Sequence, residues 1–450
     1  MRRRSISNSL LAAAAAAALL APASASASSG AHCDRIAAPN GSDSATGTEA
    51  APLRSAQRLV DSLTSGQTGC LRSGSYDQSV TVRRAGITVR PYPGERATLK
   101  GRLWIAQGAD SVTFEGLKLD GRNSGELPSP TVNADDATFR HNDVTNDHTA
   151  ICFVVGSSES WGRARRTVIE SNRISRCGVM PAQNHDHGIY VEAADDTRIV
   201  GNWIYDNADR GVQLYPDAQR TTVTGNVIDG NGQGVIFSGE GTTSNDNTVE
   251  GNVITNSQIR FNIESYYPSG TPLGQRNTAT RNCVANPKRT DAGPGGIDLR
   301  EGGFTASANV TADPAFSDRA GKDFRLTPGS RCRRVMGSYA EAVPGTEGLG
   351  AMRRGRALRI SVRPRVVRRG AKTLFTGRAD LRRVRKGSRV KVLIKTAGSK
   401  RYRTVGSARV KANGRFAIRR RVRPRGRTIR VMAAASSRAR SKTLNVRVRR

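Results

Sequence analysis

The chain has 450 residues and a formal net charge of +35, from 72 lysines and arginines against 37 acidic residues. The charge is uneven: residues 351–450 hold 36 of these bases and one acid, Asp380, so the preceding 350 residues are electrically balanced. This length allows two or three domains, and the division of charge excludes a single uniform domain and predicts a boundary near residue 350.

The amino terminus has the three parts of a secretory signal peptide. A basic start, Met1–Arg4, precedes an apolar run from Leu10 to Ala21 and a small-residue segment that ends at Ala27. We expect cleavage near Ala27, which removes residues 1–27. A membrane anchor is disfavoured, because a run of about 12 residues is short of the roughly 20 that cross a bilayer. No second apolar run follows. We therefore expect a soluble, secreted or extracellular monomer without a membrane span, with cell-wall association as a further expectation.

Six cysteines fit an oxidising compartment. Six cysteines allow fifteen connectivities, and sequence alone does not choose among them. The simplest pairing is local: Cys33–Cys70, Cys152–Cys177 and Cys283–Cys332. No CxxC pair suggests zinc, and we expect no cofactor.

Residues 28–75 lead into the first domain. Pro52 begins a helix-like run with one apolar face, formed by Leu53, Ala56, Leu59, Val60 and Leu63. Short strands are expected after it, at residues 80–82, 87–89, 103–105 and 112–114, where apolar and polar residues alternate.

From residue 139 to residue 300 a short phrase recurs, an asparagine followed by any residue and an aliphatic one. Its copies begin at Asn142, Asn172, Asn202, Asn226, Asn252 and Asn282, at intervals of 30, 30, 24, 26 and 30 residues. A second alternating phrase follows each copy, at residues 151–153, 189–191, 212–214, 235–237, 263–264 and 297–299. Two strands in each period predict a solenoid.

The phrases indicate which kind of solenoid this is. They are too short for helices, Asn-Gly and similar turn pairs exclude helical repeats, and leucine does not recur at fixed spacing, which excludes leucine-rich repeats. Stacked coils pair strand on strand and enclose an aliphatic core. The repeated asparagine can stack on itself at a turn. We predict an all-β parallel β-helix over residues 76–336, with residues 28–75 capping its first edge.

The repeat resembles the right-handed parallel β-helix proteins of the pectate-lyase-like class, from about Asn40 to Cys332. The segment Gly47–Arg54 with Gln57 is similar to the capping segment of those proteins. The resemblance implies a secreted protein that binds and acts on polysaccharide, with a uronate-containing substrate favoured. The class includes lyases, hydrolases and epimerases. This chain lacks the Asp-Pro-His motif of alginate epimerases and the Gly-His-Gly and Arg-Ile-Lys motifs of polygalacturonases, so the reaction stays open.

The densest polar segment runs from Asn184 to Tyr190. Because Ile189 and Val191 should face the core, Tyr190 should face outward. The preceding coil offers Asp147-His148 and the following one Asp209-Arg210, which predicts a column of Asp-His, Asp-His and Asp-Arg. The candidate catalytic residues are His187, Asp186, His148, Asp209, Arg210 and Tyr190. The candidate substrate-binding residues are His185, Gln213, Tyr215, Glu264, Asp298 and Arg300.

These side chains suit acid–base chemistry on a sugar. A lyase needs a base, for which His187 or Tyr190 is suited, and a cation such as Arg210 for the uronate carboxylate. A hydrolase needs two carboxylates, for which Asp186 and Asp209 are candidates. The alternative is that Asp and His only cap backbone groups at turns. The chain would then be a non-catalytic carbohydrate-binding, adhesin or envelope protein.

Other residues carry weaker expectations. Trp161, Tyr266 and Tyr267 lie in or beside loops and either pack locally or stack on sugars. Calcium has candidate ligands in Glu192, Asp195 and Asp196, although adjacent acids in a turn are usually solvated.

The last part of the chain differs in composition. Residues 337–356 contain glycines and prolines typical of a linker, and residues 357–450 alternate in some seven short strands that predict a small immunoglobulin-like sandwich. Its bases predict binding to anionic cell-envelope polymers. It holds only three aromatic residues, Phe375, Tyr402 and Phe416, too few for a base-stacking surface, so a specific nucleic-acid partner is not expected.

Overall fold

The computed structural model of the protein describes residues 32–123, 125, 127–157 and 161–347. In the basic region it describes residues 358–363, 366–368, 372–379, 388–396, 399, 402–411, 415–421, 428–434 and 444–449. The predicted signal peptide lies outside these residues. Within them, no helix has the length and apolarity needed to cross a membrane.

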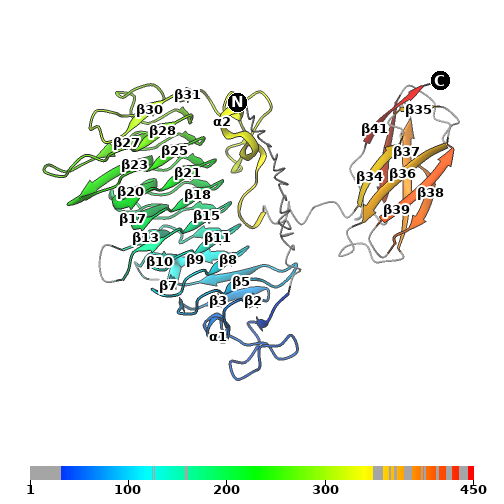
Figure 1. The fold of residues 1–450 in the computed structure, drawn as a ribbon, viewed down its shortest axis with the longest axis horizontal. Helices are drawn as coiled ribbons and strands as arrows, with labels where there is room; N and C mark the ends of the chain where they lie inside the picture. The colour runs from blue at the N-terminus through cyan, green and yellow to red at the C-terminus, as the bar shows by residue number, and fades with distance from the viewer. Residues whose placement is uncertain are drawn as a thin grey trace, which may run out of the picture. The chain divides into compact units, whose positions relative to one another are not determined.

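Three parallel sheets run along the solenoid, and successive strands of the chain pass from one sheet to the next (Figure 1). Sheet A contains β1 (Arg35–Ala37), β2 (Thr68–Leu71), β5 (Thr88–Pro91), β8 (Thr113–Glu115), β11 (Thr138–Arg140), β15 (Val168–Glu170), β18 (Arg198–Val200), β21 (Thr222–Thr224), β25 (Thr248–Glu250), β28 (Thr278–Thr280) and β30 (Thr305–Ser307). Sheet B contains β3 (Gly74–Asp77), β6 (Ala97–Lys100), β9 (Lys118–Asp120), β12 (Asp143–Thr145), β16 (Arg173–Ser175), β19 (Trp203–Tyr205), β22 (Val227–Asp229), β26 (Val253–Thr255), β29 (Cys283–Ala285) and β31 (Val310–Thr311).

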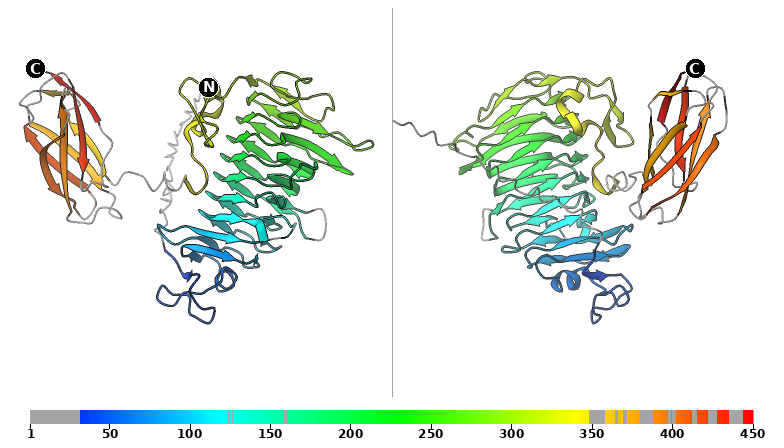
Figure 2. Two further views of the ribbon diagram at one scale, coloured as in Figure 1. Left: turned by 180° about the vertical axis from the view of Figure 1, so that it is seen from behind. Right: turned by 45° about the vertical axis from the view of Figure 1, so that its right-hand side comes forward.

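Sheet C carries the longest strands of the solenoid. It contains β4 (Val80–Val82), β7 (Leu103–Ile105), β10 (Thr131–Val132), β13 (Phe153–Gly156), β17 (Ile189–Asp195), β20 (Arg210–Gln219), β23 (Gln233–Glu240) and β27 (Ile263–Tyr266), with β14 (Ala164–Arg165) beside β17 and β24 (Thr242–Thr243) beside β23. Figure 2 shows the green strands of this sheet extending past the shorter strands of sheets A and B. The short 3-10 helix η1 (Gly121–Asn123) follows β9.

The prediction of two strands in each period was wrong, because each complete coil has three. The asparagine phrase forms sheet B and most copies of the second phrase form sheet C, whereas the sheet A strands within the repeat were missed. The strands expected at residues 87–89 and 112–114 overlap β5 and β8 of sheet A. Most sheet A strands are three residues long and place one apolar residue, such as Phe139 or Ile169, in the core, which is too little alternation to identify a strand. A residue with positive φ, such as His141 at 56° or Gly225 at 66°, then turns the chain into the asparagine.

The predicted asparagine ladder is confirmed. Each side-chain amide donates to the Oδ1 of the next asparagine at 2.9–3.1 Å, in the order Asn142, Asn172, Asn202, Asn226, Asn252, Asn282 and Asn309. Each Oδ1 also accepts the backbone N–H of the asparagine one coil earlier, as between Asn226 and Asn202 at 2.8 Å. The ladder therefore satisfies buried backbone groups at the corner between sheets A and B.

The core confirms the predicted inward face of sheet C. Ile189, Val212, Leu214, Val235 and Ile297 belong to one cluster of buried residues that runs through the solenoid. The three local disulfides are also confirmed: Cys33–Cys70, Cys152–Cys177 and Cys283–Cys332.

The capping helix starts later than predicted. α1 (Ala56–Asp61) begins after Ser55, whose side chain accepts the N–H of Arg58 at 3.1 Å, and not at Pro52. The helical N-cap bond at Ser55 explains this start. Leu53 precedes the helix and pairs with Ala37 instead, while the predicted apolar face is buried. Figure 2 shows α1 at the end of the solenoid where β2 and β3 lie.

Residues 312–347 return along the outer face of sheet B. They form β32 (Phe316–Asp318), β33 (Asp323–Leu326), α2 (Arg333–Met336) and the 3-10 helix η2 (Gly337–Glu341). Phe324 and Met336 pack against Trp203 and Val227 of sheet B. The segment predicted as a linker, residues 337–356, therefore begins in contact with the solenoid: Gly345 donates its N–H to the carbonyl of Ser171 at 2.7 Å. Residues 348–356 lie outside the described residues.

The basic region forms a separate two-sheet sandwich. One sheet has the order β34 (Leu358–Arg363), β36 (Lys372–Ala379) and β39 (Arg415–Arg421). The other has the order β35 (Val366–Arg368), β41 (Leu444–Arg449), β40 (Thr428–Ala434), β37 (Arg389–Thr396) and β38 (Arg403–Arg409). Phe375, Val392, Ile418 and Val431 are buried in one core between the sheets. The arrangement agrees with the predicted small β domain.

Candidate functional site

The predicted column lies at the corner where the chain passes from sheet B into sheet C. Ile189 pairs with Val212, so two residues earlier His187 lies beside Arg210. Asp186 lies beside Asp209, whose N–H donates to the Asp186 carbonyl at 2.9 Å. The structure therefore brings these two coils together as the sequence predicts.

The first member of the column is out of register. Phe153 pairs with Ile189, so the position beside His187 belongs to Ile151 and not to His148. His148 lies on the preceding turn, with a φ of 65°, and its Nδ1 is 2.9 Å from the Gly178 carbonyl. His148 lies five positions before Phe153, whereas His187 lies two positions before Ile189. This difference in turn length removes His148 from the stack.

His187 is a buried, neutral imidazole. It is 3% exposed, and burial lowers its pKa well below 6.5, with further lowering from Arg210 and His185. Its ring meets Tyr190 edge to face at 5.7 Å. Among the described residues, its Nδ1 has no hydrogen-bond partner. His185 itself is exposed. Burial beside a guanidinium therefore keeps His187 in its unprotonated form.

Arg210 supplies a buried cation next to this imidazole. Its Nη1 donates to the Asn184 carbonyl at 2.8 Å, and Nη2 reaches the Asn184 side chain. Burial lowers its pKa, yet an arginine keeps its proton at any physiological pH. Gln233 pairs with Arg210 on the next coil. Gln233 was not identified as a candidate site residue from the sequence.

A second row runs along the outer face of the same strands. Tyr190 pairs with Gln213, Gln213 with Ile236, and Ile236 with Glu264. Glu264 is 1% exposed, and burial raises the pKa of its carboxyl despite an ion pair with Arg260 at 2.7 Å. Tyr190 therefore faces outward, as predicted, beside the buried side chain of Gln213.

Five buried polar atoms in these two rows have no hydrogen-bond partner among the described residues. They are Nδ1 of His187, Nε of Arg210, and one side-chain oxygen each of Gln213, Gln233 and Glu264. Buried polar groups are paired in the great majority of cases, because leaving one unpaired costs about 1–3 kcal/mol. These atoms on neighbouring coils are left to be satisfied by bound water or by a ligand.

Three arginines surround one buried ring beside these rows. The guanidinium carbons of Arg260, Arg289 and Arg300 lie 5.9, 4.9 and 5.4 Å from the ring centre of Phe261. Each arginine is partly exposed. Only Arg300 was a predicted site residue. We call Arg260, Arg289 and Arg300 the arginine rim.

The rim is held in place by carboxylates. Arg300 binds the predicted residue Asp298 at 2.7 Å and shares Asp291 with Arg289. The hydrogen bond from Arg289 lowers the pKa of Asp291 to about 2, and that from Arg300 lowers the pKa of Asp298. The carboxylates therefore stay ionised and fix the guanidinium groups in position.

Aromatic side chains lie on or near sheet C as well. Tyr190 and Tyr215 stack at 6.1 Å, and the hydroxyl of Tyr215 bonds to Glu240. Burial raises the pKa of Tyr190, so its phenol keeps its proton. Tyr266 is 52% exposed, and Trp161 is 50% exposed while its ring meets Trp104 at 5.3 Å. Tyr267, in contrast, is buried.

Asp209 stabilises the turn that contains Asp186. It is buried, and its carboxylate accepts the N–H of Asp186 at 3.1 Å. The carboxylate pair considered for a hydrolase is therefore partly committed to the backbone.

Two of the three calcium candidates, Asp195 and Asp196, are held by arginines. Asp195 binds Arg163 at 2.8 Å, and Asp196 binds Arg220 at 2.9 Å. In the part of the chain that the structure describes, no group of three or more His, Cys, Asp or Glu side chains is arranged to hold a metal ion.

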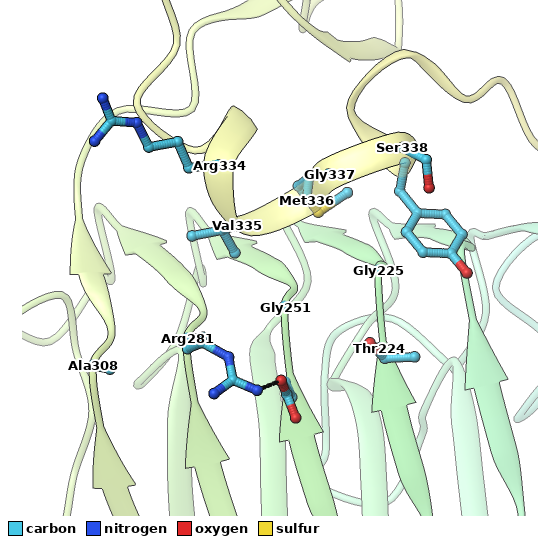
Figure 3. Close-up of a pocket in the computed structure, with 12 residues that line it drawn as sticks. Thr224, Gly225, Gly251, Arg281, Ala308, Arg334, Val335, Met336, Gly337 and Ser338 are labelled. Carbon is cyan, nitrogen blue, oxygen red and sulfur yellow. Dashed lines mark hydrogen bonds and ion pairs between the residues drawn. The ribbon is translucent and has the colours of Figure 1, made fainter.

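A groove of about 560 Å³ lies at another corner, where α2 and η2 cross the turns between sheets A and B. Figure 3 shows Val335 and Met336 above these turns and Arg281 bonded to Glu250. Gly225 is required there, since its φ is 66° and an added Cβ would lie 2.3 Å from Tyr339. None of the predicted site residues lines this groove, which results from packing of the returning segment.

Comparisons with known proteins agree with this fold. A family described as "Right handed beta helix region" matches residues 107–311, which confirms the right-handed parallel β-helix. Pectate lyase PEL9 of Emericella nidulans is 34% identical over 104 residues, and the match spans 23% of this chain and 23% of that protein.

Two solved structures are similar at lower identity. Pectate lyase Pel9A is 14% identical with a TM-score of 0.46, covering 67% of this chain and 91% of that chain. A rhamnogalacturonan lyase is 12% identical with a TM-score of 0.45, covering 63% and 90%.

Proposed function

We propose that this right-handed parallel β-helix protein binds an acidic, uronate-containing polysaccharide on the outer face of sheet C and cleaves it as a lyase. The observation that carries the proposal is the group of unpaired buried polar atoms around His187 and Arg210. The name of the curated relative, a pectate lyase, supports the same substrate class.

The chemistry requires a base, a cation and a proton donor. The base takes the proton from the carbon next to the uronate carboxylate. That electron pair forms a carbon–carbon double bond as the bond to the oxygen of the neighbouring sugar breaks, and the departing oxygen takes up a proton. Charge on the carboxylate must be neutralised for the proton to become acidic enough to leave.

The side chains suit these roles unequally. His187 is unprotonated because burial and Arg210 lower its pKa, which favours it as the base. Burial raises the pKa of Tyr190, which favours it as the donor to the departing oxygen and disfavours it as a base. Arg210 is the nearest buried cation for the carboxylate. The arginine rim would hold the carboxylates of neighbouring sugars.

The test is the formation of unsaturated products from polygalacturonate, measured by ultraviolet absorbance. His187→Asn should lower the rate by about 10²-fold or more, as expected when a general base is lost. His141→Asn is the matched control, because burial also lowers the pKa of half-buried His141, which lies at the corner between sheets A and B. Full activity in His187→Asn, or release of reducing ends without unsaturation, would contradict the proposal.

Polysaccharide binding without turnover is the second candidate. It is favoured by the exposed aromatic residues Tyr266 and Trp161 and by the commitment of Asp209 to its turn. It predicts that polygalacturonate is retained but never cleaved, and that Tyr215→Ala weakens retention.

A further inference from the structure

The sandwich contains a row of basic residues across all three strands of its smaller sheet. The pairing sets Arg359 of β34 in line with Arg378 of β36, and Arg378 in line with Arg415 of β39. Adjacent strands lie about 4.8 Å apart. The exposed residues Lys372 and Arg421 are also directly opposite each other, and like charges in this position destabilise a sheet.

Further bases extend this row. Lys372 is paired with Arg421, and Arg419 lies opposite Leu374. Lys372, Arg419 and Arg421 are exposed, whereas the alternate residues Phe375, Phe416 and Ile418 are buried in the core. The bases therefore belong to the outer face of this sheet, which we call the basic face.

The larger sheet is also basic but is interrupted. Arg389 pairs with Arg409 in this sheet. On the same strand as Arg389 and Lys391, Leu393 pairs with Met432, so an apolar pair interrupts the bases. Residues 357–450 contain one acidic residue, Asp380, for 33 bases, so the domain cannot neutralise either face by itself.

We propose that the basic face, carried by β34, β36 and β39, is a second binding site, for a linear acidic polysaccharide. Relief of the like-charge repulsion and release of counterions would drive the association. A nucleic acid is less suited, because Phe375 and Phe416 are buried in the core, which leaves few rings for base stacking. The choice of a polysaccharide among polyanions rests on the function proposed for the solenoid.

The test compares two triple variants of the full chain for binding to immobilised polygalacturonate. Lys372→Gln/Arg419→Gln/Arg421→Gln removes charge from the basic face. Arg389→Gln/Lys391→Gln/Arg409→Gln removes the same charge from exposed positions of the larger sheet.

We expect the first variant to weaken binding about tenfold or more at about 50 mM salt, the second by about threefold or less, and the natural chain to dissociate by about 500 mM. Melting curves should show that neither variant unfolds the domain. As a second check on folding, Lys372→Arg/Arg419→Lys/Arg421→Lys should retain binding because it retains charge.

Three results would overturn the proposal: equal losses in the two triple variants, absence of binding at low salt, or a basic face that prefers poly(dT) over polygalacturonate. The cleavage assay is independent, because the solenoid is the same in every variant. A natural chain that cleaves polygalacturonate but is not retained on it contradicts only the second site, and a natural chain that is retained but does not cleave contradicts only the lyase.

Discussion

Replacement of Asn226 by alanine tests the asparagine ladder directly. The Oδ1 of Asn226 accepts the N–H and the side-chain amide of Asn202 at 2.8 and 2.9 Å, and its own amide donates to Ile199 and Asn252 at 2.8 and 3.0 Å. These groups are buried, so water cannot replace the lost partner. At about 1–3 kcal/mol for each stranded group, with partial relaxation, the loss should reach about 4 kcal/mol.

The matched control is Asn309→Ala at the end of the ladder. Asn309 makes the same bonds to Asn282 but is half-exposed and has no asparagine beyond it, so we expect a loss of about 1 kcal/mol. Urea unfolding followed by circular dichroism measures both values. Equal losses, or less than about 1 kcal/mol for Asn226→Ala, would refute the view that the ladder satisfies buried backbone groups.

Three further predictions concern the solenoid. Val212→Asp places a charge in the core and should cost more than about 4 kcal/mol in thermal unfolding, and a normal melting temperature would show that Val212 faces outward. The folded-state pKa of His187 lies well below 6.5, so the unfolded chain binds its proton first and stability falls as the pH drops below 6.5. His187→Gln should abolish that loss between pH 6.5 and about pH 5.5, and an unchanged pH profile would contradict it. Cys152→Ala/Cys177→Ala opens a 25-residue loop and should lower the unfolding free energy by about 3 kcal/mol in denaturant titrations, whereas no change would mean that the disulfide does not restrict the unfolded chain.

The sequence alone determined the features that repeat or are local. Asparagine recurring every 24 to 30 residues specified the stacked coils, because only a repeated position can pair with its own copy one coil away. Alternation placed Ile189 inward and Tyr190 outward, since this property depends only on neighbours along one strand. The charge of residues 351–450 separated the basic domain by composition alone.

The tertiary structure decided the register between coils and the composition of the site. His148 and His187 look equivalent in the sequence, but the number of residues in each turn sets which of them reaches the stack, and Ile151 takes the place beside His187. The strands of sheet A within the repeat, from β11 onward, were missed because one inward side chain per strand leaves no period to detect.

The arginine rim shows the same limit most clearly. Arg260, Arg289 and Arg300 share no motif and are separated by up to 40 residues, yet they surround Phe261. Loops between strands follow no period, so their side chains meet only where the coils stack. The sequence therefore determined which face of each strand points outward, and the stacking of coils determined which outward side chains form a site.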